Sequence, residues 1–167
     1  MKRVLSWVLG GLLCSCASGQ PPTAAVELGG PQRPALAEYN LKDSLALQGY
    51  DPVSYFPEGG ARPEPGDPGQ ALRYRGVVYR FSSRANRRRF EAEPGRYEPA
   101  YGGWCAWAMA RGFRVRIDPL SYTLQDEKLR LFYRNPIVDT RAKWLRGEFQ
   151  ELAGAADDHW ARRSEAG

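Results

Sequence analysis

Residues 74–90 read Y-R-G-V-V-Y-R-F-S-S-R-A-N-R-R-R-F, and the class of fold follows from them. Two short alternating runs, residues 71–74 and 77–81, are separated by only two residues, which is typical of a β-hairpin. A serine pair follows, and its hydroxyls can cap a helix over residues 84–92 with Phe90 on the inner face. A hairpin that leads directly into a helix indicates an α+β arrangement.

The chain after residue 100 continues this alternation of helices and hairpins. Residues 121–124 and 129–133 form a second predicted hairpin, and residues 104–111, 137–145 and 148–162 have helical spacing. The side chains expected to point inward from the last two helices are Trp144, Leu145, Phe149, Leu152 and Trp160. We therefore predict a small single α+β domain in which antiparallel hairpins pack against helices.

The first fifteen residues have the layout of a bacterial secretion signal, because Lys2 and Arg3 precede an apolar run of about ten residues. The L-C-S-C that follows resembles the lipobox of bacterial lipoproteins, which implies cleavage before Cys16 and acylation of that cysteine. We predict a lipoprotein-type signal peptide over residues 1–15, with an uncleaved anchor helix as the alternative. Because Ala17 follows, and not aspartate, the expected location is the outer membrane, facing the periplasm.

Residues 16–38 are rich in proline and glycine and poor in large apolar side chains. This composition predicts a lipid-anchored tether without a core of its own. Residues 39–163, about 120 residues, are enough for one packed core and form the predicted domain. The expected partners are the membrane, reached through the anchor, and another protein of the cell envelope.

The chain has 24 basic and 19 acidic residues, a formal net charge of +5 that falls to +3 when Lys2 and Arg3 leave with the signal. No groove-reading motif accompanies this small excess, so we do not expect nucleic acid as a partner. Of the three cysteines, Cys14 would be discarded and Cys16 lipidated. Cys105 would then be the only free thiol, and no intramolecular disulfide could form.

Five phrases in this order resemble the YHS-domain family, most closely its longer secreted type, some members of which are selenoproteins. They are G-Y-D-P-V-S-Y-F (49–56), Y-R-G-V-V-Y-R-F-S-S (74–83), F-E-A-E-P-G-R-Y (90–97), Y-G-G-W-C-A-W-A (101–108) and L-R-L-F-Y (129–133). The resemblance covers roughly residues 40–160. It implies a small treble-clef-like α+β fold and no particular activity.

Shorter relatives in that family place metal-binding cysteines in D-P-x-C and F-C-S-x-x-C. The matching positions of this sequence are Ser54, Ser82 and Asn86. Hydroxyls and amides do not replace thiolates on a soft or borderline ion. The sequence therefore predicts that the relatives' structural metal site is absent here.

Cys105 is the main candidate for chemistry. A double glycine precedes it, and a helix start there would place its sulfur near free N–H groups that stabilise a thiolate. Met109 lies one turn further on, so a thiolate and a thioether could share one helix face and hold copper, as Cu(I), or another soft metal ion. The alternative is that both sulfurs are buried and fill space in the core.

The remaining polar candidates have simpler interpretations. His159 is the only histidine and is expected on an exposed helix face. Asp51 and Asp118 each precede proline, where aspartate commonly accepts hydrogen bonds from nearby backbone N–H groups in a turn. The arginine run at residues 84–89 is either a solvated helix face or a surface for acidic lipid headgroups.

Two functions follow from these residues. The first is an envelope lipoprotein whose YHS-like domain acts as a binding or redox-accessory module, with Cys105 as soft-metal ligand or redox thiol. The second is a non-catalytic structural or interaction lipoprotein in which Cys105 is inert and buried. An enzyme is less expected, because the sequence has no nucleophile–base pair, phosphate loop or paired-carboxylate motif.

Overall fold

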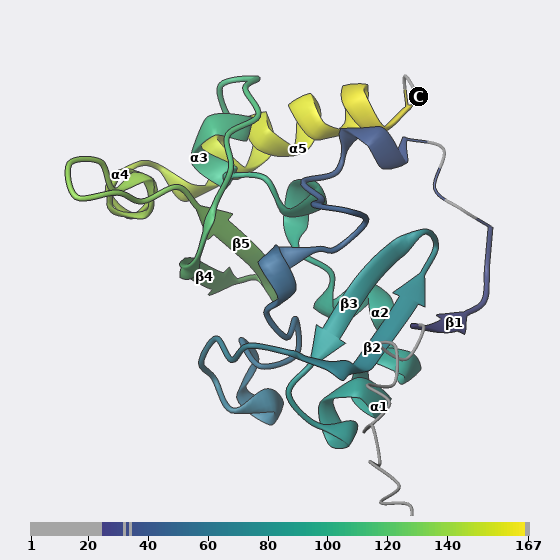
Figure 1. Cartoon of the computed structure of the whole chain (residues 1–167). Helices are drawn as coiled ribbons and strands as arrows, with labels where there is room; N and C mark the ends of the chain where they lie inside the picture. The colour runs from purple at the N-terminus through teal and green to yellow at the C-terminus, as the bar shows by residue number, and fades with distance from the viewer. Residues whose placement is uncertain (1–24, 32, 34, 166–167) are drawn as a thin grey trace, which may run out of the picture.

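The structure is a computed structural model that describes residues 25–31, 33 and 35–165, and it is a mixed α+β fold, as predicted. Two small sheets lie apart, each with its own helices (Figure 1). The strands are β1 (Val26–Leu28), β2 (Asp67–Tyr74), β3 (Val77–Phe81), β4 (Asp118–Gln125) and β5 (Lys128–Phe132). The α-helices are α1 (Arg84–Ala92), α2 (Pro94–Tyr97), α3 (Ala106–Met109), α4 (Thr140–Arg146) and α5 (Phe149–Glu165). Short 3-10 turns span Leu36–Glu38, Leu47–Gly49, Pro57–Gly59 and Ala100–Gly103.

The first sheet has the strand order β1-β2-β3 and carries α1 on one face. β2 and β3 pair antiparallel, as the hairpin pattern predicted, and Ser83 caps α1 by accepting a hydrogen bond of 3.1 Å from Asn86 N. Phe90 is fully buried and packs against Tyr79, with ring centroids 4.7 Å apart. An aromatic side chain buried in this way contributes an apolar area large enough to fix the helix on the sheet.

The second sheet is the predicted hairpin of β4 and β5, which pair antiparallel. Helices α3, α4 and α5 lie on the same end of the molecule as this hairpin (Figure 1). Trp144 of α4 is buried against Phe132 of β5, with ring centroids 5.6 Å apart. The predicted inward position of Leu145 is wrong, because its side chain is 53% exposed.

Helix α3 is shorter than the sequence predicts. The expected helix over residues 104–111 is reduced to the single turn Ala106–Met109, and Cys105 is its N-cap, in an extended conformation. Cys105 N donates to Val115 O at 3.0 Å, in the loop after α3, so this N–H group does not take part in a helix. Gly112 has a positive φ of 77° and donates its N–H to Met109 O, so it ends the turn as expected.

Residues 26–28, 33 and 35–38 contact the domain, although the sequence assigned them to a tether. β1 pairs with β2 in parallel, with Val26 opposite Leu72 and Leu28 opposite Tyr74. Trp104 Nε1 donates to Glu38 O at 2.6 Å. The packed part of the chain thus begins before residue 39, and the signal peptide, Cys14 and Cys16 lie outside the described residues.

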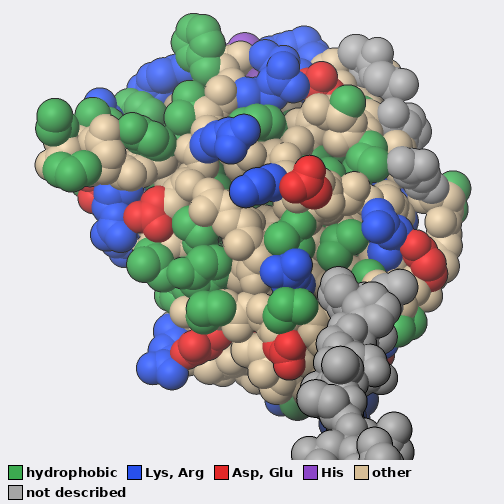
Figure 2. Space-filling model, in the orientation of Figure 1, with side chains coloured by type: hydrophobic (Ala, Val, Ile, Leu, Met, Phe, Trp, Pro, Cys, Tyr) green, Lys and Arg blue, Asp and Glu red, His purple; other side chains and the backbone are tan. Residues whose placement is uncertain are grey.

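Apolar side chains gather over the α4 end of the face in Figure 2, where Ile137 is 92% exposed. No helix within the described part of the chain has the length and apolar character that crossing a bilayer requires.

Candidate functional site

Cys105, the leading candidate from the sequence, lies in the hydrophobic core. Its side chain has no exposed surface, and Sγ is 3.3 Å from Thr140 Oγ1. Thr140 Oγ1 in turn donates to Tyr133 O at 2.7 Å. A thiol enclosed in this way has no path for a substrate or an oxidant, so the geometry favours the inert alternative.

Met109 is also completely buried, one turn after Cys105. No group of three or more histidine, cysteine, aspartate or glutamate side chains is arranged to hold a metal ion among the described residues. His159 lies on α5, where its Nδ1 is 2.7 Å from Arg162 Nη2. His159 is thus held by a neighbour on its own helix.

We expect Cys105 to be unreactive in the folded protein. The test uses the chain from residue 17, which lacks Cys14 and Cys16. Ellman's reagent should titrate no thiol in buffer and one thiol per chain in about 6 M guanidinium chloride, a concentration above the unfolding midpoint of ordinary domains. The matched control is Ala85→Cys, at an exposed position of α1, which should add one rapidly reacting thiol in buffer. Fast reaction of the native Cys105 would support the redox or soft-metal alternative.

The buried residue Asp51 contacts the three positions Ser54, Ser82 and Asn86. Asp51 has no exposed surface, and its Oδ2 accepts hydrogen bonds from Ser82 N at 2.9 Å, Ser82 Oγ at 2.7 Å and Asn86 Nδ2 at 2.7 Å. Its Oδ1 accepts from Val53 N at 2.8 Å, the turn contact that the sequence predicted. Ser54 Oγ donates to Asp51 O at 2.7 Å. This network joins the loop before Ser54 to the start of α1, a connection that elsewhere a metal ion could make.

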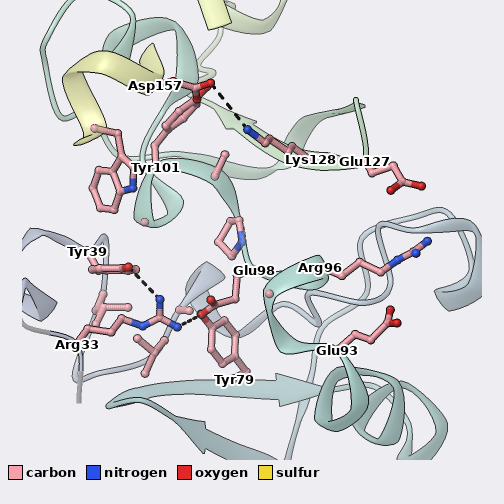
Figure 3. A pocket seen from close by; sticks show the side chains of 18 of the residues that line it. Arg33, Tyr39, Tyr79, Glu93, Arg96, Glu98, Tyr101, Glu127, Lys128 and Asp157 are labelled. Atoms are coloured by element: carbon pink, nitrogen blue, oxygen red, sulfur yellow. Dashed lines mark hydrogen bonds and ion pairs between the residues drawn. The ribbon is translucent and has the colours of Figure 1, made fainter. Parts of the chain in front are cut away.

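A candidate site for ligand binding is a pocket of about 550 Å³ between the two halves of the molecule (Figure 3). Tyr79 of β3 lies on one side, and Tyr101 and Trp160 lie on the other. Gly102 has a φ of +59°, and a Cβ there would lie 2.6 Å from Trp160 Cη2. Gly102 thus permits close packing in the pocket wall.

Arg33 reaches into this pocket from the segment before the first 3-10 turn. Its guanidinium forms an ion pair with Glu98 and donates to Tyr39 Oη at 3.0 Å (Figure 3). It also lies 5.0 Å from the centre of the Tyr39 ring and 5.4 Å from that of Tyr74. Burial lowers the pKa of Arg33, but Glu98 and Tyr39 outweigh this effect and the pKa is raised, so the side chain stays charged.

Two tyrosines in the pocket, Tyr79 and Tyr101, have raised pKa values. Tyr79 Oη donates to Glu98 Oε1 at 2.7 Å, and burial, followed by the Glu98 charge, raises the pKa of Tyr79 well above its ordinary value. Burial raises the pKa of Tyr101 to about 12, although Arg130 acts in the opposite direction. Both hydroxyls therefore remain donors at neutral pH.

The charges of the pocket favour a positively charged ligand. Each of its basic side chains has a carboxylate partner: Glu98 for Arg33, Glu58 for Arg96 and Asp157 for Lys128. Three carboxylates of the rim, Glu93, Asp126 and Glu127, have no ion pair among the described residues. The uncompensated charge facing the pocket is therefore negative, beside rings that attract cations.

Comparisons of this chain with family models, with curated proteins and with solved structures give no match. No sequence pattern indicates Arg33 or Glu98 as a pair. Arg33 lies in a Pro/Gly-rich segment, and Glu98 lies 65 residues further along the chain.

Proposed function

We propose that this protein is a lipid-anchored, non-catalytic binding module of the cell envelope, with a YHS-type domain and a ligand site in the Arg33–Glu98 pocket. The single observation that carries the ligand site is the pocket itself, with aromatic walls and an unneutralised acidic rim. The convergence of Ser54, Ser82 and Asn86 on Asp51 supports the YHS-type fold, since these are the positions that resemble the relatives' metal cluster. The buried thiol supports a role without redox chemistry.

The ligand that fits is a small organic cation with an amine or guanidinium group. The pocket already holds one guanidinium, that of Arg33, between a carboxylate and aromatic rings. A second cationic group at the rim would meet Glu93 or Glu127, and its apolar part would contact Trp160. Aromatic rings and carboxylates together recognise such ligands in water.

Agmatine, which carries both groups, is the probe for this proposal. We expect isothermal titration calorimetry to detect agmatine binding to the chain from residue 17, and no binding of the dianion succinate. The double variant Glu93→Gln/Glu127→Gln should weaken agmatine binding about fivefold, because two exposed charge contacts contribute about 1 kcal/mol together.

The matched control is Glu148→Gln/Glu151→Gln, which removes two exposed carboxylates that do not line the pocket. This variant should bind agmatine as the parent does. Absence of agmatine binding, or an equal loss in both variants, would contradict a cation site in this pocket.

A further inference from the structure

The arginine-rich face of α1 lies beside the point where the described chain begins. β1 runs parallel to β2 with Val26 opposite Leu72, so Ala25 lies toward the Gly69–Gln70 end of β2. Gly69 and Gln70 line a shallow hollow together with three arginines and one glutamate of α1, namely Arg84, Arg87, Arg88 and Glu91.

The length of chain before Ala25 limits how far this face can lie from the membrane. Residues 17–24 separate Cys16 from Ala25, and an extended chain covers at most about 3.5 Å per residue, so the span is about 30 Å. This segment, A-S-G-Q-P-P-T-A, has no charged residue. Because residues 26–28 are paired with β2, the chain after Ala25 adds nothing to the reach of the anchor.

The charge of this helix face is mostly uncompensated. Arg84, Arg88 and Arg89 are exposed, and Arg84 and Arg88, one turn apart, have no ion pair among the described residues. Arg87 is paired with Glu91 at 2.8 Å, and Glu93 follows the helix, so the acidic residues of this element lie toward its C-terminal end. Exposed arginines without acidic partners are attracted to an anionic lipid surface.

We propose that the α1 face formed by Arg84, Arg87 and Arg88 docks on the anionic lipid headgroups of the membrane that holds the anchor. This inference rests on the proposed acylation of Cys16. The attraction of a few arginines is weak by itself, but a short anchor raises the effective concentration of this face at the surface. Docking would leave the α4 and α5 end of the molecule pointing away from the membrane (Figure 1).

The test uses the unacylated chain from residue 17, which contains every residue that the structure describes, so the result does not depend on acylation. We expect it to sediment with phosphatidylcholine vesicles that contain 40% phosphatidylglycerol, to be released by 0.5 M NaCl, and not to bind pure phosphatidylcholine vesicles. Because each arginine near such a surface contributes about 1 kcal/mol, Arg84→Gln/Arg88→Gln should lower the partition coefficient roughly 30-fold.

The control Arg141→Gln/Arg146→Gln removes two exposed arginines of α4 and should keep the parent's partition coefficient. Equal losses in the two double variants would show attraction by net charge alone and would overturn the proposal, as would absence of binding by the parent. Incorporation of labelled palmitate at Cys16 in cells tests the anchor separately. Loss of that label would overturn the anchor without changing the vesicle result.

Discussion

Asp51→Ala is expected to lower the free energy of unfolding by about 4 kcal/mol, because it leaves the backbone N–H groups of Val53 and Ser82 and two side-chain donors unsatisfied inside the protein. A loss of this size is a large share of the 5–15 kcal/mol that holds an ordinary domain together. Asp51→Asn keeps one acceptor oxygen and should lose about 2 kcal/mol. Urea unfolding followed by tryptophan fluorescence measures both.

Asp118→Ala is the matched control, because Asp118 also precedes proline and also accepts a backbone hydrogen bond, from Leu120 N at 2.9 Å. Its carboxylate is partly exposed and pairs with Arg134, whose side chain is 45% exposed. We expect a loss below about 1 kcal/mol, since an exposed ion pair contributes little. Similar losses for the two alanine variants would show that the buried network does not hold α1 in place.

Glu98→Ala should destabilise the protein by about 3 kcal/mol, because it leaves the Arg33 guanidinium without a carboxylate and Tyr79 Oη without an acceptor. The Arg33 side chain is only 10% exposed, so water does not replace the lost partner fully. The paired replacement Arg33→Met/Glu98→Leu should recover the part of this loss that comes from the unpaired guanidinium, as apolar side chains of similar volume often replace a buried ion pair, while Tyr79 Oη stays without its acceptor. Urea unfolding of the parent and both variants provides the comparison.

Glu27→Ala is the control for this prediction, because Glu27 of β1 pairs with Arg73 in an exposed position. The Glu27 side chain is 67% exposed, and we expect a change below about 0.5 kcal/mol. If Glu98→Ala changed the stability no more than Glu27→Ala does, the Arg33–Glu98 pair would not fix the N-terminal segment on the domain.

Local sequence patterns predicted most helices and strands of this fold. The Asp51 network and the pocket depend on contacts between residues that are distant in sequence. Both hairpins and the Ser83 cap follow from alternation and from a hydroxyl before a helix, which act within a few residues. The Asp51 network depends on Asn86, 35 residues away, and no local rule connects the two. A turn role was therefore predicted for both Asp51 and Asp118, although only Asp51 is buried beneath α1.

The same reasoning explains why Cys105 looked more reactive in the sequence than in the structure. The double glycine suggested a helix start with free N–H groups, but Cys105 N is bonded to Val115 O and the helix is a single turn. The tether was assigned by composition alone. Pairing of β1 with β2 and the insertion of Arg33 between tyrosine rings require a partner surface that composition does not reveal.

The position of β1 has a consequence for how copies of this protein behave at high surface density. β1 covers Leu72–Tyr74 on the outer edge of β2, so the N–H and C=O groups there already have partners. An open strand edge recruits strands from neighbouring molecules, and confinement of the proposed lipoprotein to two dimensions would raise the frequency of such encounters. β1 is now the edge strand of this sheet, but it is only three residues long and carries Glu27, and short charged edge strands are poor templates for pairing. The segment that would lead to the proposed anchor thus also acts against sheet-to-sheet aggregation between crowded copies.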